Sequence, residues 1–190
     1  MKHHGLAVLA AGAALLAPTG GAFAAVESFT HTITNVTDTD LFTLPAFDLA
    51  LGTLESVNLT LTVGSTSTVS FANTDEGFDG IYPNAVFSVA LYPSVAAPGG
   101  GVSLYLSKLF MTPVTFQDGT GQVSVSIDAS TNSAYANSSQ LGEYTGSSPV
   151  FFEFDVGPVD YLSDSDPNSI LLSAGHSTTV ANGSFTVSYI

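Results

Sequence analysis

The chain has 190 residues and a formal net charge of −14 at pH 7, from 16 acidic residues against 2 basic ones. This imbalance argues against binding to nucleic acid or to an anionic membrane surface, because almost no side chain can pair with phosphate. Cysteine is absent. A hydrophobic core must therefore hold the fold without disulfides.

The first 24 residues have the layout of a secretory signal peptide. Lys2 precedes an apolar run from Leu6 to Ala17, and small residues follow up to Ala24. We therefore predict cleavage after Ala24, export, and a single domain over residues 25–190. The apolar run is shorter than the ~20 residues of a bilayer-spanning helix. No membrane insertion of the mature chain is expected.

Strand patterns fill residues 25–190. In chain order, we predict strands at 28–34, 57–63, 69–71, 85–92, 101–109, 123–127, 150–156, 170–173 and 185–189. The clearest is 57–63, where apolar and polar residues alternate with the two-residue period of a half-buried strand. Helix-favouring residues are scarce. The pattern predicts an all-β antiparallel sandwich, jelly-roll or Ig-like, with roughly eight to ten strands.

Turn-forming residues predict the connections. Gly64 to Thr66 is predicted to be a hairpin turn, from which the next strand returns. Phe116 leads through Asp118-Gly119-Thr120-Gly121 into the predicted strand at 123–127. Residues 72–84, 129–148 and 160–168 are rich in Ser, Asn, Asp and Gly, and we predict surface loops there.

Three stretches resemble the choice-of-anchor E domain family. They are Leu44 to Val63 (LPAFDLALGTLESVNLTLTV), Phe116 to Ile127 (FQDGTGQVSVSI) and the ending NGSFTVSYI. The resemblance implies an exported bacterial surface domain to which no catalytic residues are attached. Members often carry a C-terminal sorting tail, and no such tail is recognisable here. We therefore expect any retention at the surface to be non-covalent.

Two acidic stretches are candidates for a structural calcium ion. The candidate ligands are Asp75, Glu76 and Asp79 in the first stretch, and Asp164 and Asp166 in the second. The second stretch departs from an EF-hand loop, because Ser169 and Gly175 stand where that loop needs glycine and glutamate. Solvated turns use the same residue types. Apart from this optional calcium, no cofactor is expected.

Enzymatic activity is not expected. Beyond the leader, the chain has one lysine, no cysteine and two histidines, His31 and His176. His31 falls on the apolar side of a predicted strand and is interpreted as a core or rim histidine, while His176 lies in a predicted turn. No G-x-S-x-G elbow, phosphate loop or paired-histidine metal motif is present. A hydrolase using two carboxylates is the less favoured reading.

The sequence therefore predicts an exported, non-enzymatic surface or extracellular-matrix protein with a structural or adhesive role. Its strands carry long Thr/Ser faces and almost no lysine, which favours self-association. The alternative is a carbohydrate-binding β-sandwich that recognises polysaccharide. Candidate stacking residues for a sugar are Tyr82, Tyr92, Tyr105, Tyr135, Tyr144 and Tyr161. Tyr92 and Tyr105 fall within predicted strands, where packing on the pleated surface is the simpler explanation.

Overall fold

Twelve strands and two short 3₁₀ helices make up the described part of a computed structural model, which covers residues 26–73, 79–157, 159–163, 172–175 and 178–190. The helices are η1 (Leu49–Leu51) and η2 (Ser138–Tyr144). The strands are β1 (Glu27–Val36), β2 (Thr39–Leu44), β3 (Val57–Asn73), β4 (Gly80–Leu91), β5 (Ser94–Ala97), β6 (Gly100–Ser103), β7 (Leu106–Gln117), β8 (Thr120–Tyr135), β9 (Val150–Asp155), β10 (Val159–Ser163), β11 (Leu172–Gly175) and β12 (Thr179–Tyr189). The predicted leader lies outside the described residues.

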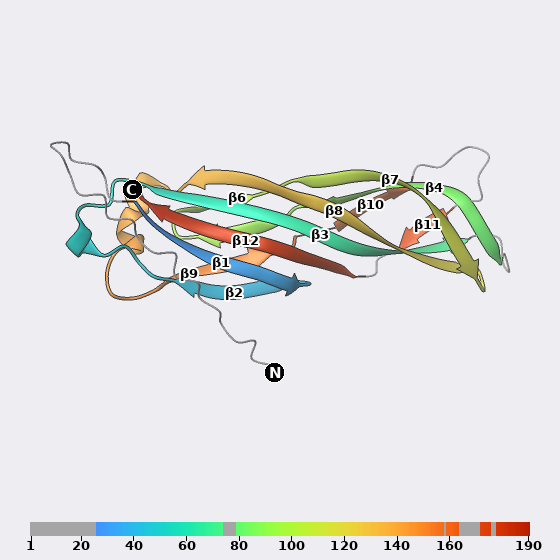
Figure 1. The fold of residues 1–190 in the computed structure, drawn as a ribbon, viewed down its shortest axis with the longest axis horizontal. Coiled ribbons are helices and arrows are strands. Elements are labelled where there is room, and N and C mark those ends of the chain that lie inside the picture. Colours follow the sequence, from blue (N-terminus) through green and yellow to red (C-terminus); the bar gives the residue numbers. More distant parts are fainter. Residues whose placement is uncertain (1–25, 74–78, 158, 164–171, 176–177) are drawn as a thin grey trace.

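The strands form two antiparallel sheets. Sheet A has the order β1-β12-β3-β8-β7-β4-β10, with β11 also paired to β3, and sheet B has the order β2-β9-β5-β6. The molecule is elongated, and β3 and β8 run along most of its length (Figure 1). The predicted all-β antiparallel class is confirmed. The strand count exceeds eight to ten because strands such as β5 and β10 were not predicted, while β11 overlaps the predicted strand at 170–173.

Strand β3 is continuous through Gly64, so the predicted hairpin turn at Gly64 to Thr66 is wrong. Every second residue from Val57 to Phe71 is buried without a break in the alternation. The register between β3 and β8 shifts by one residue between Val63 and Ser65. A Cβ on Gly64 would lie 3.0 Å from the backbone nitrogen of Ala129. Glycine therefore serves a β-bulge here, where the partner backbone approaches closely, and not a turn.

All three predicted loops are partly strand. Residues 72–73 and 80–84 of the predicted loop 72–84 belong to β3 and β4. Strand β8 continues through residues 129–135, and η2 follows within the predicted loop 129–148. Residues 160–163 of the predicted loop 160–168 belong to β10, which pairs with β4. The second half of β8 was missed because it lacks apolar alternation. Its backbone is nevertheless paired with β3 from Ser130 to Tyr135, so tertiary pairing overrides local composition.

The core contains two aromatic groups. In one, Phe42 contacts Phe152 of the same sheet and Phe185 of the opposite sheet, with ring centroids 5.5 and 5.7 Å apart. In the other, Phe87 contacts Phe71 at 5.1 Å and Phe110 at 5.5 Å. These side chains close the space between the layers and leave the opposite face of each sheet to solvent.

The segment between β2 and β3 is a folding element. Phe47 is buried, and Asp48 caps η1 by accepting a hydrogen bond from the backbone nitrogen of Ala50 at 2.8 Å. The carbonyl of Pro45 accepts a hydrogen bond from the Tyr189 hydroxyl at 2.8 Å. This stretch, the most distinctive of the three that carry the family resemblance, thus ties the chain to the last strand of the core.

Candidate functional site

The outward side of β1, β12, β3 and β8 is a broad, mostly uncharged surface, which we call the hydroxyl face. Alternation along each strand and the register between strands place its members on one side of sheet A. They are Ser28, Thr30 and Thr32 on β1; Asn182, Ser184, Thr186 and Ser188 on β12; Asn58, Thr60, Thr62, Thr66, Thr68 and Ser70 on β3; and Gln122, Ser124, Ser126, Thr131, Ser133 and Tyr135 on β8. The predicted Thr/Ser faces of the strands thus combine into one surface.

Hydroxyls on neighbouring strands of this face are hydrogen-bonded in pairs. The oxygens are 2.8 Å apart in Thr30–Thr186, Thr60–Ser133 and Thr62–Thr131, 2.9 Å in Ser28–Ser188, 3.2 Å in Thr66–Ser126 and 3.3 Å in Thr68–Ser124. Each hydroxyl has one donor and two acceptor positions. A pair therefore keeps one donor and three acceptor positions for an outside partner or water.

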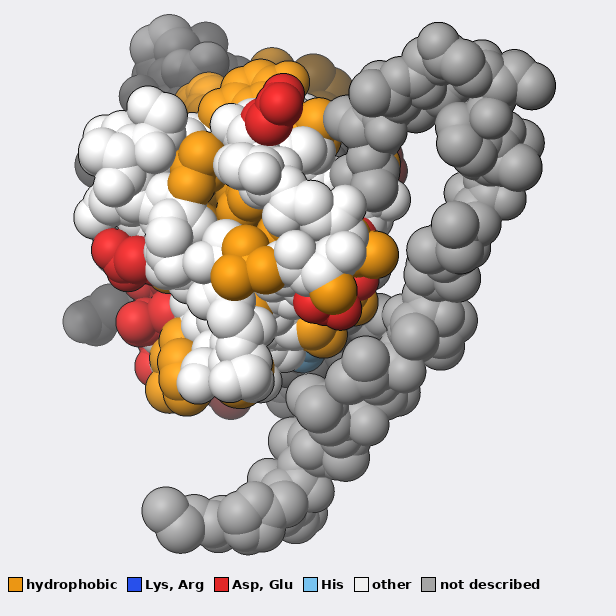
Figure 2. All heavy atoms as spheres, turned by 90° about the vertical axis from the view of Figure 1, so that its left-hand side faces the viewer, with side chains coloured by type: hydrophobic (Ala, Val, Ile, Leu, Met, Phe, Trp, Pro, Cys, Tyr) orange, Lys and Arg blue, Asp and Glu red, His pale blue; other side chains and the backbone are white. Residues whose placement is uncertain are grey.

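Charge is sparse on the hydroxyl face. None of the side chains named above is charged at neutral pH, although the chain has 16 acidic residues. The exception is Asp128 at the β8 bulge, between Ser126 and Thr131, whose side chain is 94% exposed and whose carboxylate lies 3.5 Å from Lys108. Lys108 also donates to the carbonyl of Ser126 at 3.3 Å. Figure 2, viewed from the end where β8 and β12 finish, shows several acidic side chains and no basic one among the described atoms in view.

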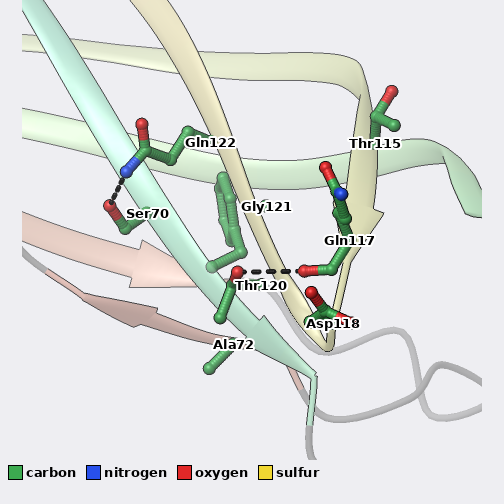
Figure 3. A pocket seen from close by; sticks show the side chains of 9 residues that line it. Ser70, Ala72, Thr115, Gln117, Asp118, Thr120, Gly121 and Gln122 are labelled. Atoms are coloured by element: carbon green, nitrogen blue, oxygen red, sulfur yellow. Dashed lines mark hydrogen bonds between the residues drawn. The ribbon is translucent and has the colours of Figure 1, made fainter. Parts of the chain in front are cut away.

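A hollow of about 720 Å³ lies at the β7–β8 hairpin end of the face (Figure 3). Gln122 Nε2 donates to Ser70 Oγ at 3.3 Å, and Thr120 Oγ1 donates to the carbonyl of Gln117 at 3.1 Å. Ser70 and Gln122 belong to both the hollow and the hydroxyl face. The hollow continues the hydrogen-bonding side chains of the face and adds one carboxylate, that of Asp118, to its lining. No sequence signal marked the hollow in advance.

A tight turn at Asp118 and Gly119 closes this hairpin. Asp118 and Gly119 have φ values of 52° and 73°, the left-handed backbone that an Asp-Gly turn of type I′ requires. The backbone nitrogen of Asp118 donates to Asp79 Oδ1 at 2.6 Å. One carboxylate oxygen of this calcium candidate therefore already has a protein partner. Among the described residues no group of three His, Cys, Asp or Glu is placed to hold a metal.

The other four calcium candidates, Asp75, Glu76, Asp164 and Asp166, lie outside the described residues, so calcium binding stays a prediction. His176 lies outside them as well. His31 packs as the sequence predicted. Its ring stacks on Phe42 with centroids 3.9 Å apart, and its Nε2 lies 2.9 Å from Asp40 Oδ2. No serine is among the partners described for His31, and this geometry is that of a packed, hydrogen-bonded rim histidine.

The tyrosines separate into buried and exposed groups. Tyr144 is fully buried, which rules it out as a stacking surface for a sugar, and Tyr161 lies where side chains are not described. Tyr92 and Tyr105 lie between strands and not within them, contrary to the prediction. Their exposed rings are 5.1 Å apart and tilted by 42°. Tyr135 is 68% exposed and stands on the hydroxyl face at the end of β8.

The outer face of sheet B carries exposed apolar side chains, unlike the hydroxyl face of sheet A. Leu41 and Phe151 are 74% and 75% exposed and line an apolar groove of about 520 Å³, with Ala96, Pro98 and Glu153 beside them. This groove was not predicted, because Leu41 and Phe151 lie on the solvent side of their strands. Single exposed apolar side chains are common on protein surfaces.

No protein-family model matches the chain, and a search of curated proteins finds no match. No helix of the described residues is long and apolar enough to cross a membrane.

Proposed function

We propose that the chain is an exported, non-enzymatic surface or extracellular-matrix protein with an adhesive or structural role. The hydroxyl face is the observation that carries this proposal. It is a broad surface spread over four strands, and such a surface suits contact with an extended partner better than binding of a small molecule, which favours a concave apolar pocket. The leader-like first 24 residues and the resemblance to the choice-of-anchor E domain family support the exported location.

The proposal is tested by expressing the full chain in a bacterial host. Protease accessibility on intact cells and the N-terminal residue of the processed form measure export, with Ala25 expected as the new N-terminus. Attachment of the cells to a solid surface under flow measures adhesion. A Leu15→Arg/Leu16→Arg variant, which interrupts the apolar run of the leader, should stay unprocessed and lose the added attachment. The proposal fails if the wild-type chain remains inside the cell, or if exported protein leaves attachment unchanged.

Carbohydrate binding is the second candidate function, and the Tyr92–Tyr105 pair favours it. Two exposed phenol rings 5.1 Å apart offer apolar faces with polar edges, which suit a sugar ring that has an apolar face of its own. Retention of the purified protein on a glycan array, lost in a Tyr105→Ala variant, would support a sugar site at this pair.

A further inference from the structure

We propose that the hydroxyl face binds a neutral linear polysaccharide, with the chain lying along β3 and β8 between Tyr135 and the Ser70–Gln122 hollow. This inference rests on the proposed adhesive function and names its partner by chemistry. Three properties of the face carry it: the hydroxyl pairs, the low density of charge and the linear arrangement.

The hydroxyl pairs match the chemistry of a sugar chain. Each pair presents both donor and acceptor positions to the outside, and sugar hydroxyls likewise donate and accept. An apolar partner would gain nothing here, because Tyr135 is the face's one large aromatic side chain. Protein interfaces place aromatic and apolar residues at their core, and the hydroxyl face lacks such a core.

Charge selects against other polymers. Nucleic acids and acidic polysaccharides would be repelled by a chain of net charge −14. A second copy of this chain would carry the same charge. A neutral polymer meets no such repulsion. Along the face it passes two carboxylates, that of Asp128, which is paired with Lys108, and that of Asp118 in the hollow.

The linear arrangement fits an extended chain. Pairs recur at every second residue of β3 on each side of Gly64, at Thr60 and Thr62 and again at Thr66 and Thr68, with a repeat of about 6.8 Å. Neighbouring strands lie about 4.8 Å apart. The 17 residues of β3 span roughly 55 Å, enough for several sugar units in a row. At one end Tyr135 offers a ring for stacking, and at the other the hollow of about 720 Å³ provides the Gln122 amide and the Thr120 hydroxyl.

The test is affinity electrophoresis of the mature chain in native gels that contain hydroxyethyl cellulose, xylan or dextran, with alginate as the anionic comparison. We expect at least one neutral polymer to retard the protein and alginate to leave it unaffected. A Thr62→Val/Thr131→Val variant removes one hydroxyl pair but keeps β-branched residues on both strands. It should weaken retardation several-fold, and Tyr135→Ala should weaken it as well.

Matched controls lie off the face. Thr39→Val changes an exposed threonine of sheet B, and Tyr105→Ala removes an exposed ring of similar exposure to Tyr135. Thr39→Val should bind like the wild type, and so should Phe151→Ala, which removes a ring of sheet B that is 75% exposed, against 68% for Tyr135. Tyr105→Ala tests the alternative sugar site at the Tyr92–Tyr105 pair. Thermal melts should show that all variants are folded. The inference is overturned if no neutral polymer retards the protein, or if binding depends on Tyr105 and not on Tyr135.

A second copy as the occupant would also overturn it. Light scattering would then show a dimer that the Thr62→Val/Thr131→Val variant abolishes, without any effect of polysaccharide. None of these failures removes the proposed adhesive function, because export and cell attachment are measured separately.

Discussion

Two tyrosine hydroxyls secure the end of the core. Tyr144 and Tyr189 are fully buried, and their rings lie 6.3 Å apart. Tyr144 donates to the carbonyl of Pro98 at 2.6 Å, and Tyr189 donates to that of Pro45 at 2.8 Å. Both carbonyls belong to irregular segments between strands. A buried hydroxyl needs such a partner, since an unpaired one would lose its bonds to water without compensation. The sequence suggested Tyr144 as a stacking residue for a sugar. In the structure it is buried and its hydroxyl instead holds the carbonyl of Pro98.

Removing the Tyr144 hydroxyl should destabilise the protein. In Tyr144→Phe the carbonyl of Pro98 loses its donor, and we expect the free energy of unfolding to fall by about 1–2 kcal/mol in urea denaturation. Tyr105→Phe, which changes an exposed ring, should alter stability by less than about 0.5 kcal/mol. Equal effects of the two changes would contradict the role of this hydrogen bond.

Alkaline pH should weaken the fold through the same residues. Burial raises the pKa of Tyr144 to about 12, with a smaller contribution from Glu143, and burial also raises the pKa of Tyr189. An unfolded tyrosine loses its proton near pH 10, at about its ordinary pKa. Above that pH the folded state holds more protons than the unfolded state, so stability falls as pH rises.

We expect the melting temperature to be insensitive to these two groups below pH 10 and to decline between pH 10 and 12. The decline should be shallower in Tyr144→Phe, because one of the two groups is then absent. If the melting temperatures of wild type and variant declined in parallel, the Tyr144 hydroxyl would not contribute to the pH dependence of stability.

At the scale of elements, the β12–β3 pairing depends on close backbone approach. Gly183 of β12 pairs with Val63 of β3, and a Cβ on Gly183 would overlap the carbonyl oxygen of Thr62. The neighbouring Gly64 faces the β8 bulge on the other side of β3. Two glycines thus allow three strands to lie together at the middle of the hydroxyl face, where the predicted hairpin would have ended the strand.

Adding a methyl group at Gly183 should be costly. We expect Gly183→Ala to lower the free energy of unfolding by about 1–3 kcal/mol or more, because backbone atoms must move to make room. Gly142→Ala is the matched control, since a Cβ there meets no atom within 4 Å. Urea denaturation of both variants measures the difference. Similar stabilities would mean that β12 can shift away from β3 at little cost.

On the scale of the whole molecule, acidic charge is spread over a fold with little internal compensation. Among the described residues, the ion pairs are His31–Asp40 and Lys108–Asp128, and Asp128 is almost fully exposed. An exposed pair such as Lys108–Asp128 contributes little to the free energy of unfolding. Most carboxylates therefore repel one another, which opposes both compact folding and association between copies.

Added salt should stabilise the protein. Screening is effective beyond about 10 Å at 0.1 M salt, so we expect the melting temperature to rise with NaCl. Lys108→Gln should lower the melting temperature at low salt, and the gap to wild type should narrow as salt increases. Light scattering in the same titration tests self-association, which should increase with salt. A melting temperature that falls with NaCl would contradict this account of the charge.

The sequence predicted those features that a local pattern can carry. The two-residue period of Val57 to Val63 showed a half-buried strand, because burial of one face imposes that period regardless of the partner. The alternation of Val123, Val125 and Ile127 with serines predicted the first half of β8 in the same way. Thr and Ser opposite the apolar residues predicted polar strand faces. The placement of His31 on the apolar side of β1 followed from the same alternation.

Only the tertiary structure decided how these strands combine. Gly64 reads locally as a turn, yet pairing with β8 and β12 on both sides makes it a bulge position in one long strand. The second half of β8 has no pattern of its own, since the neighbouring β3 supplies its hydrogen-bond partners. The hydroxyl face arises from four strands that lie far apart along the chain. Sequence alone determined that each strand has a polar side, and the register between strands brought those sides together, because register depends on partners that no local pattern specifies.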